Sequence, residues 1–252
     1  MNPYIQKASM LKRIIAWMFD SMLVMMVAIL MASWLSGVMN YDTDAAELEA
    51  HYNRFEEVYG VDFDITEEDF SKLSAEQQEQ FNLAYEALST DEEAMGVYSR
   101  LITMTLGLIS IALLIGVLLL EFVVPLLFKN GQTLGKKIFG IALMRTDCVR
   151  ISPLSLFVRT LLGKFAIETM VPLLLGLLVL WGAIGVIAPA VILGLLVLQI
   201  VLLIKSEHNA AIHDRMACTV VVDYASQMIF KTPEEAAAYH EKLEKTESVF
   251  KD

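Results

Sequence analysis

The sequence predicts an all-α integral membrane protein with about four transmembrane helices. Of its 252 residues, 56% are hydrophobic and 19% are charged. A soluble domain is usually about half apolar and about a quarter charged. The apolar excess is concentrated in segments 14–38, 101–128 and 165–204, which carry almost no charge. This uneven distribution, more than the average composition, indicates a membrane protein.

The lengths of these segments predict the number of spans. An α-helix needs about 20 apolar residues to cross ~30 Å of hydrocarbon. The first two segments are each long enough for one crossing. Segment 165–204 would be roughly 60 Å long as a single helix at ~1.5 Å per residue, so we expect it to cross twice. A tight turn in its middle is favoured by the residues found there: Trp181, Gly182, Gly185 and Pro189.

The net charge of −11 divides into two unlike parts. Residues 40–99 contain 17 acidic and two basic residues, a net charge of −15, so the rest of the chain carries +4. Short loops rich in Lys and Arg remain on the cytoplasmic side of a membrane. With four spans, all three basic clusters fall on one side, which we expect to be cytoplasmic together with both termini: Lys7, Lys12 and Arg13; Lys129, Lys136, Lys137, Arg145 and Arg150; Lys205 and Arg215. The acidic segment is then expected outside.

Short elements are predicted between the spans. The acidic segment is expected to be helical, because capping pairs occur at three helix starts: Thr66 with Asp69, Ser74 with Gln77, and Thr90 with Glu93. The third helix is expected to run into the second span. Segments 137–146 and 217–224 resemble strands and predict a short cytoplasmic pair. Ser152-Pro153 predicts the start of an interfacial amphipathic helix, and Thr232-Pro233 predicts a polar helical tail.

The predicted organisation has eight parts. They are 1–38 (N-terminus and first span), 39–100 (acidic extracytoplasmic helical insertion), 101–128 (second span), 129–152 (cytoplasmic loop with a strand), 153–182 (interfacial helix and third span), 183–204 (fourth span), 205–224 (cytoplasmic His-Asp motif and strand) and 225–252 (cytoplasmic polar helical tail).

Charged residues inside apolar spans are the candidates for function. Asp20 lies seven residues after Arg13, nearly two turns along the same helix face, and Glu121 lies at a similar depth in the second span. Such groups are costly in a membrane unless they are paired, protonated or hydrated. They therefore predict either a site for protons or cations, or ion pairs that hold helices together. Lys164 and Glu168 are four residues apart and favour a structural pair; Arg159 precedes them.

Other motifs do not support known chemistry. Gly131–Lys137 (GQTLGKK) is one residue short of a nucleotide-binding loop, so we expect a turn whose lysines meet lipid phosphates. Residues 62–73 lack the glycine and glutamate of a calcium loop. His208 and His213 lack the spacing of a helical zinc pair. We expect no metal site, no cofactor, no nucleic-acid partner and no enzymatic activity.

Three motifs in order resemble the RDD family of prokaryotic membrane proteins. They are RIIAWMFD at 13–20, GQTLGKKIFGI at 131–141 and HDRMACTV at 213–220, and the resemblance covers 1–38 and 101–224. The family is named for an arginine and an aspartate in the first helix and a second aspartate, here Arg13, Asp20 and Asp214. The insertion at 40–99 is a departure, since that loop is usually short in the family. The resemblance implies a bacterial inner (plasma) membrane protein, and some members resemble cation/proton antiporters.

Two functions of different classes are expected. The first is a small cation/proton transporter for Na⁺, K⁺ or H⁺, with Asp20 as the central carboxylate, Glu121 assisting it, and Arg13 with Asp214 organising the inner mouth. Four helices make a thin wall around a water-filled path, so we expect a homo-oligomer in the lipid bilayer. The second is a non-catalytic scaffold or accessory protein that binds a partner through its acidic outer domain.

Overall fold

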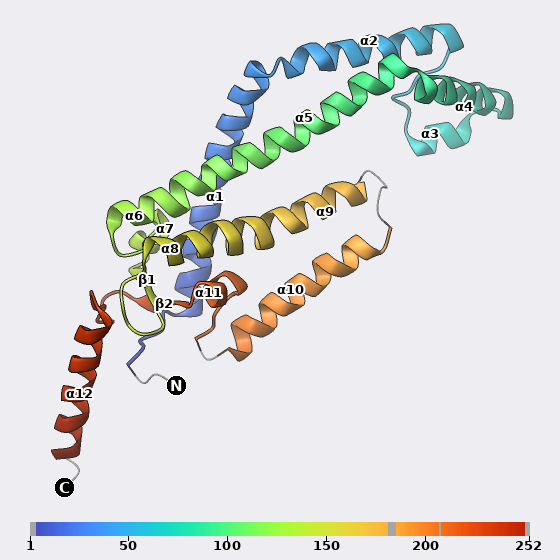
Figure 1. Ribbon diagram of the computed structural model, residues 1–252. Coiled ribbons are helices and arrows are strands. Elements are labelled where there is room, and N and C mark those ends of the chain that lie inside the picture. The colour runs from blue at the N-terminus through green and yellow to red at the C-terminus, as the bar shows by residue number, and fades with distance from the viewer. Residues whose placement is uncertain (1–3, 181–184, 207, 250–252) are drawn as a thin grey trace. The chain divides into compact units, whose positions relative to one another are not determined.

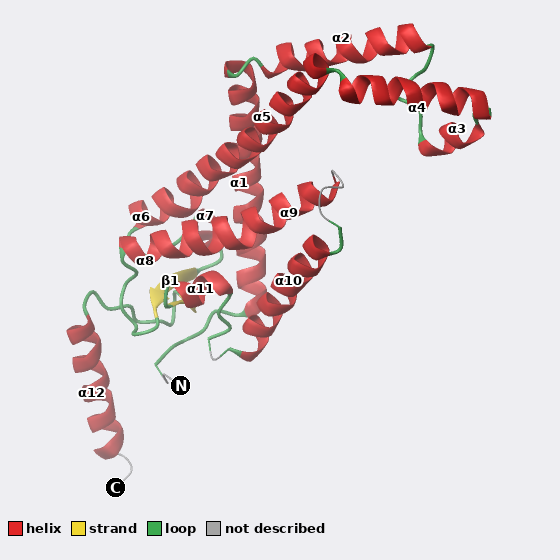
Figure 2. Cartoon of the chain, turned by 45° about the vertical axis from the view of Figure 1, so that its right-hand side comes forward, coloured by secondary structure: helices red, strands yellow, loops and turns green. Residues whose placement is uncertain are grey.

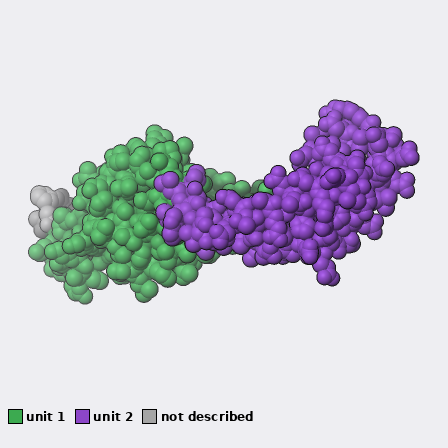
Figure 3. All heavy atoms as spheres, turned by 90° about the horizontal axis from the view of Figure 1, so that it is seen from above, with its two compact units in different colours: residues 1–28, 113–252 green, residues 29–112 purple. Residues whose placement is uncertain are grey.

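The computed structural model describes residues 4–180, 185–206 and 208–249 (Figure 1). It divides into two compact units, which Figure 3 colours separately. The first unit comprises residues 1–28 and 113–252, and the second comprises residues 29–112. The predicted turn at Trp181 and Gly182 lies outside the described residues.

Among the described residues, four helical runs are long and apolar enough to cross a membrane, as the sequence predicts. They are α1 (Met10–Val38); α5 (Glu92–Val117) with π-helix η1 (Leu118–Val123) and α6 (Val124–Phe128); α8 (Pro153–Phe157) with π-helix η2 (Val158–Met170) and α9 (Val171–Leu180); and α10 (Ile187–Lys205). Helix α5 begins in the acidic segment and continues without a break into the second span, as the sequence predicts. The predicted interfacial helix is not a separate element: Pro153–Leu180 is one continuous run.

The surfaces of these helices require an apolar solvent. In the most apolar part of α10, only 6% of the residues are buried within the chain, and in α1 only 22%. Leu30, Leu127 and Leu180 are among the many large apolar side chains left exposed. Soluble proteins rarely expose apolar patches on this scale. The helices therefore fit a lipid environment, where exposed backbone must bond internally as a helix does.

A small sheet joins distant parts of the first unit. Strands β1 (Ile141–Arg145) and β2 (Thr219–Asp223), yellow in Figure 2, pair antiparallel, with Ile141 opposite Asp223. The predicted strand pair is confirmed, although β1 is shorter than expected because Lys137 and Ile138 belong to helix α7 (Leu134–Ile138). The strands alternate between two apolar clusters, so each face of the sheet has a core.

The N-terminal segment and the last helix pack near this sheet. The backbone N–H of Ala8 donates to the carbonyl of Val221 at 3.2 Å. Helix α11 (Ile212–Met216) precedes β2, and helix α12 (Pro233–Val249) begins at the predicted Thr232-Pro233. The rings of Tyr4 and His240 stack with centroids 3.9 Å apart, which connects α12 to the start of the chain.

The second unit contains the acidic helices, α2 (Tyr41–Tyr59), α3 (Glu67–Lys72) and α4 (Ala75–Thr90). Thr66 caps α3, and Ser74 forms the predicted capping box with Gln77 at the start of α4. The third prediction was wrong by one residue: Asp91, not Thr90, accepts the bond from the Ala94 N–H, at 2.8 Å. A carboxylate at this position is the stronger cap because it also carries a charge that favours the helix N-terminus.

Candidate functional site

The first unit contains several ionisable side chains that are almost completely buried. Asp20 is 4% exposed and Asp214 is 1% exposed. Glu121, Lys136 and Arg159 are also buried. An isolated charge in such surroundings would be very unfavourable, so the partners of each group define what the site can do.

Asp20 binds the turn that follows the second span. Its carboxylate accepts a hydrogen bond from the Thr133 hydroxyl and one from the Gly135 N–H, the latter at 2.7 Å. Lys136 Nζ lies 3.9 Å from the same carboxylate. Thr133 caps α7, so Asp20 places a negative charge at the start of that helix. Arg13, which the sequence puts on the same helix face, pairs with Asp214 instead.

Gly135 makes this close approach possible. A Cβ atom at this position would lie 2.5 Å from the carbonyl oxygen of Ala16 and 2.9 Å from Asp20 Oδ1. Contacts below 3.0 Å essentially do not occur for real side chains, so any other residue would force α7 away from α1. The glycine of the GQTLGKK motif is therefore explained by helix contact and not by phosphate binding.

Lys136 is a buried amine, not a surface lysine. Its Nζ donates to Thr133 Oγ1 at 3.2 Å, so one hydroxyl connects it with Asp20. The expectation that this lysine meets lipid phosphates was wrong, because its side chain turns inward while that of Lys137 lies over the Phe128 ring. Burial, together with the positive charge of Arg159, lowers the pKa of Lys136 to about 8. The nearby carboxylates oppose this shift in pKa.

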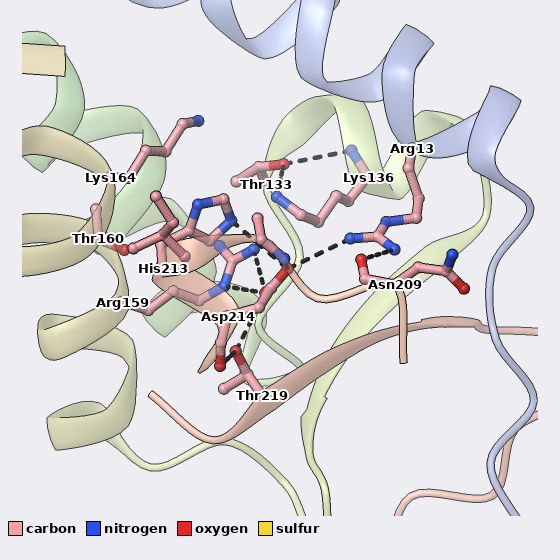
Figure 4. Close-up of polar contacts among 12 residues, drawn as sticks. Arg13, Thr133, Lys136, Arg159, Thr160, Lys164, Asn209, His213, Asp214 and Thr219 are labelled. Carbon is pink, nitrogen blue, oxygen red and sulfur yellow. Dashed lines mark hydrogen bonds and ion pairs between the residues drawn. The ribbon is translucent and has the colours of Figure 1, made fainter. Parts of the chain in front are cut away.

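Asp214 is the most completely paired carboxylate (Figure 4). Arg159 donates to its Oδ1 through Nε at 3.0 Å and Nη2 at 2.9 Å. Arg13 approaches Oδ2 from the other side at 3.3 Å. The Thr219 hydroxyl also donates, at 3.2 Å. Burial alone would raise the pKa of Asp214, but the charges of Arg159, His213 and Arg13 hold it far below its usual range.

Arg13 connects the first span with the chain after the fourth. Its Nη1 donates to the Asn209 carbonyl at 2.7 Å, while its Nη2 approaches Asp214. These two contacts fix the N-terminal end of α1 against the loop that precedes α11. The predicted link between Arg13 and Asp214 is thus present in the structure, although Asp20 takes no part in it.

The two π-helices hold the remaining charges. Lys164 in η2 pairs with Glu121 in η1, and Glu168 accepts from His213 Nδ1 at 2.6 Å. The expected Lys164–Glu168 pair is not formed. A π-helix closes its hydrogen bonds at i+5, so residues four apart no longer lie one above the other. The bond from the Thr169 hydroxyl to the Lys164 carbonyl, at 2.9 Å, spans this longer interval.

A second glycine seats α11 against η2. A Cβ at Gly163 would lie 2.6 Å from His213 Cβ. This contact brings His213 beside Glu168 and places Asp214 beside Arg159. Gly163 and Gly135 therefore have the same role: each allows two helices to approach closely.

Sequence reasoning did not assign several residues of this cluster. They are Thr133, Gly135, Lys136, Gly163, Asn209, His213 and Thr219. A signal existed for Thr133 and Gly135, since a Thr-x-Gly turn next to a membrane span can cap a short helix. None existed for Asn209, which contributes a backbone carbonyl that any residue has.

Every carboxylate of the cluster has a partner. Four carboxylates are present, and each has a cation or an imidazole beside it: Asp20 has Lys136, Glu121 has Lys164, Glu168 has His213, and Asp214 has Arg159 and Arg13. Among the described residues, no group of three His, Cys, Asp or Glu side chains could hold a metal ion.

These features define an integral membrane protein with four spans and a buried network of ion pairs at one end of its helices. The RDD family model matches residues 7–218, which is most of the chain and includes every ionisable residue of the network. The chain belongs to the RDD family. Comparisons with curated proteins and with solved structures gave no match.

Proposed function

We propose that this protein exchanges protons for a monovalent cation, Na⁺ or K⁺, across a bacterial inner membrane. The observation that carries the proposal is the group formed by Asp20, Thr133 and Lys136. A buried carboxylate in a membrane helix is a default candidate for ion transfer. Here it lies beside an amine whose pKa, at about 8, allows it to lose its proton near neutral pH.

The exchange follows from charge balance. While Lys136 is protonated, its ammonium group neutralises Asp20 and a metal cation gains little by entering. When Lys136 releases its proton to water, the carboxylate and the Thr133 hydroxyl are left to bind one monovalent cation. One proton leaves for each cation bound, so the total charge of the site does not change.

The surroundings support the same assignment. The basic loops all fall on one side of a four-span chain, which supports cytoplasmic termini and an acidic unit outside. Helix α10 is only 6% buried in its most apolar part, and a second copy of the chain packed against it would thicken the wall around a path. We therefore propose a homo-oligomer and assign no catalytic reaction.

Purified protein in liposomes tests the exchange. A pH gradient reported by a trapped dye should collapse when Na⁺ or K⁺ is added to vesicles that contain the wild type. Lys136→Gln should abolish this response, whereas the neighbouring Lys137→Gln should retain it, since Lys137 lies outside the network. If the wild type gives no response with either cation, or if both variants respond equally, the proposal is wrong.

The second candidate is a non-catalytic scaffold, which the complete pairing of the carboxylates favours. A network in which every carboxylate is paired can hold helices in register without binding any ion. In that case Lys136→Gln would lower thermal stability, and no vesicle preparation would show cation-dependent proton movement. The acidic unit, with its excess of carboxylates, would then be the surface that a basic partner binds.

A further inference from the structure

A hollow of about 630 Å³ lies at the end of the second span, away from the charge network. Its walls are Lys129, Asn130, Arg150 and the chain from Tyr224 to Lys231. This volume is within the range of about 300–1,000 Å³ usual for small-ligand sites. All of these residues belong to the first unit.

The charge of the hollow is of one sign. Lys129, Arg150 and Lys231 line it, and no acidic residue does. Within the described part of the chain, none of the three has a carboxylate at ion-pair distance. Cations nearby are paired: Arg145 lies 2.7 Å from Asp147. Two carboxylates lie behind the walls, where Glu235 accepts from the Lys231 N–H at 3.0 Å and Asp223 accepts from the Ala225 N–H at 3.1 Å. Neither of them lines the hollow, so the charged side chains that do are all cations.

Its walls are held by backbone hydrogen bonds. The Arg150 N–H donates to the Phe230 carbonyl at 2.9 Å, and the Phe230 N–H donates to the Cys148 carbonyl at 3.0 Å. The Arg150 side chain donates from Nε to the Lys129 carbonyl. The Tyr224 N–H donates to the Gly140 carbonyl at 2.9 Å. The cations are therefore carried on fixed segments and not on a free loop.

The position of the hollow identifies the source of its ligand. Lys129 directly follows Phe128, the last residue of the second membrane span. Leu127, two residues before Lys129, is 70% exposed, as expected of a side chain in contact with lipid. The hollow consequently lies where the hydrocarbon ends and lipid phosphates begin. Met228 at its edge is also exposed and offers an apolar surface to an acyl chain.

We propose that this hollow binds the phosphate headgroup of an anionic phospholipid. The ammonium groups of Lys129 and Lys231 and the guanidinium of Arg150 surround the phosphate, while the acyl chains extend along the exposed face of α6. Basic pockets beside membrane helices suit such headgroups. The proposal is independent of cation exchange, because none of these residues belongs to the charge network.

The test is lipid retention by the full chain in detergent, measured by native mass spectrometry with phosphatidylglycerol. Each neutralised cation should weaken binding on the order of fivefold. The double variant Lys129→Gln with Lys231→Gln should therefore bind roughly 25-fold more weakly than the wild type. Arg150 is left in place because its side chain also fixes the wall. The matched control, Lys205→Gln with Arg215→Gln, removes two exposed cations that do not line the hollow and should bind as the wild type does.

Two further arms distinguish the ligand. Zwitterionic phosphatidylcholine should show no difference between the double variant and its control. Inorganic phosphate at the same concentration should not displace phosphatidylglycerol. Equal retention by the double variant and its control would overturn the proposal. Displacement of the lipid by inorganic phosphate would also overturn it, since the hollow would then be a site for free anions.

Discussion

Replacement of Gly135 by alanine tests the contact on which the Asp20 site depends. The added Cβ would lie 2.5 Å from the Ala16 carbonyl oxygen, so α1 and α7 must move apart by about 1 Å to reach an ordinary contact distance. That movement stretches the 2.7 Å bond from the Gly135 N–H to Asp20 and the bond from Thr133. A hydrogen bond to a charged group contributes about 1.5–3 kcal/mol, and overpacking costs about 1–3 kcal/mol.

Helix propensity offsets part of this loss. Alanine is favoured over glycine by about 1 kcal/mol within a helix. The net destabilisation for Gly135→Ala is therefore about 1.5–5 kcal/mol, which should appear as a clear fall in the Tm in detergent. The control is Gly176→Ala in α9, where a Cβ would meet nothing within 4 Å. A Tm for Gly135→Ala equal to or above that of Gly176→Ala would refute the close approach of α7 to α1.

Three other predictions concern the network and its orientation. Gly163→Ala should destabilise the chain as Gly135→Ala does, since its Cβ would lie 2.6 Å from His213; an unchanged Tm would contradict the seating of α11. The pKa of Lys136 is about 8 in the folded chain against 10.5 unfolded, so the unfolded chain binds more protons in this window and stability should rise with pH across it, by about 3 kcal/mol in total. Thermal melts of Lys136→Met should lose that rise, whereas Lys137→Met should keep it. Cysteines placed at Ser74 and at Ser226, in a chain otherwise free of cysteine, should react with a membrane-impermeant label from opposite sides; labelling from one side would rule out four spans.

Asp214→Asn should be among the most damaging single changes. It strands the buried charges of Arg159 and Arg13, and breaking a buried pair typically costs about 3–5 kcal/mol. Asp223→Asn serves as control, because Asp223 pairs with Lys12 at the surface, where ion pairs contribute little. Similar Tm values for the two variants would show that Asp214 is not the centre of the network.

The spans, the strand pair and most helix starts could be predicted from the sequence, because they depend on properties of adjacent residues. Apolar length, β-branched runs and capping residues act locally and leave a local pattern. The positions of the buried carboxylates could also be predicted, since a charge among apolar residues is conspicuous.

The partners of those carboxylates could not be predicted. The sequence put Arg13 and Asp20 on one helix face and favoured a pair between Lys164 and Glu168, because α-helical spacing was assumed throughout each span. The π-helix η2 changes the direction of each side chain along its length, so Glu168 reaches His213 and Lys164 reaches Glu121. Lys136 and Lys137 are adjacent and identical in type, and only the close approach at Gly135 decides which of them is buried.

The small sheet has a consequence for the order in which the chain is completed. Strand β1 is made after the second span, but its partner β2 follows the fourth. The same holds for charge: Arg13 and Arg159 are synthesised before Asp214, the group that neutralises both. During synthesis, β1 therefore has no partner strand, and Arg13 and Arg159 have no carboxylate, until the final span has been made. A chain that stops before residue 212 would contain all four spans but would lack Asp214 and β2. Neither the strand pair nor the ion pairs to Asp214 could then form.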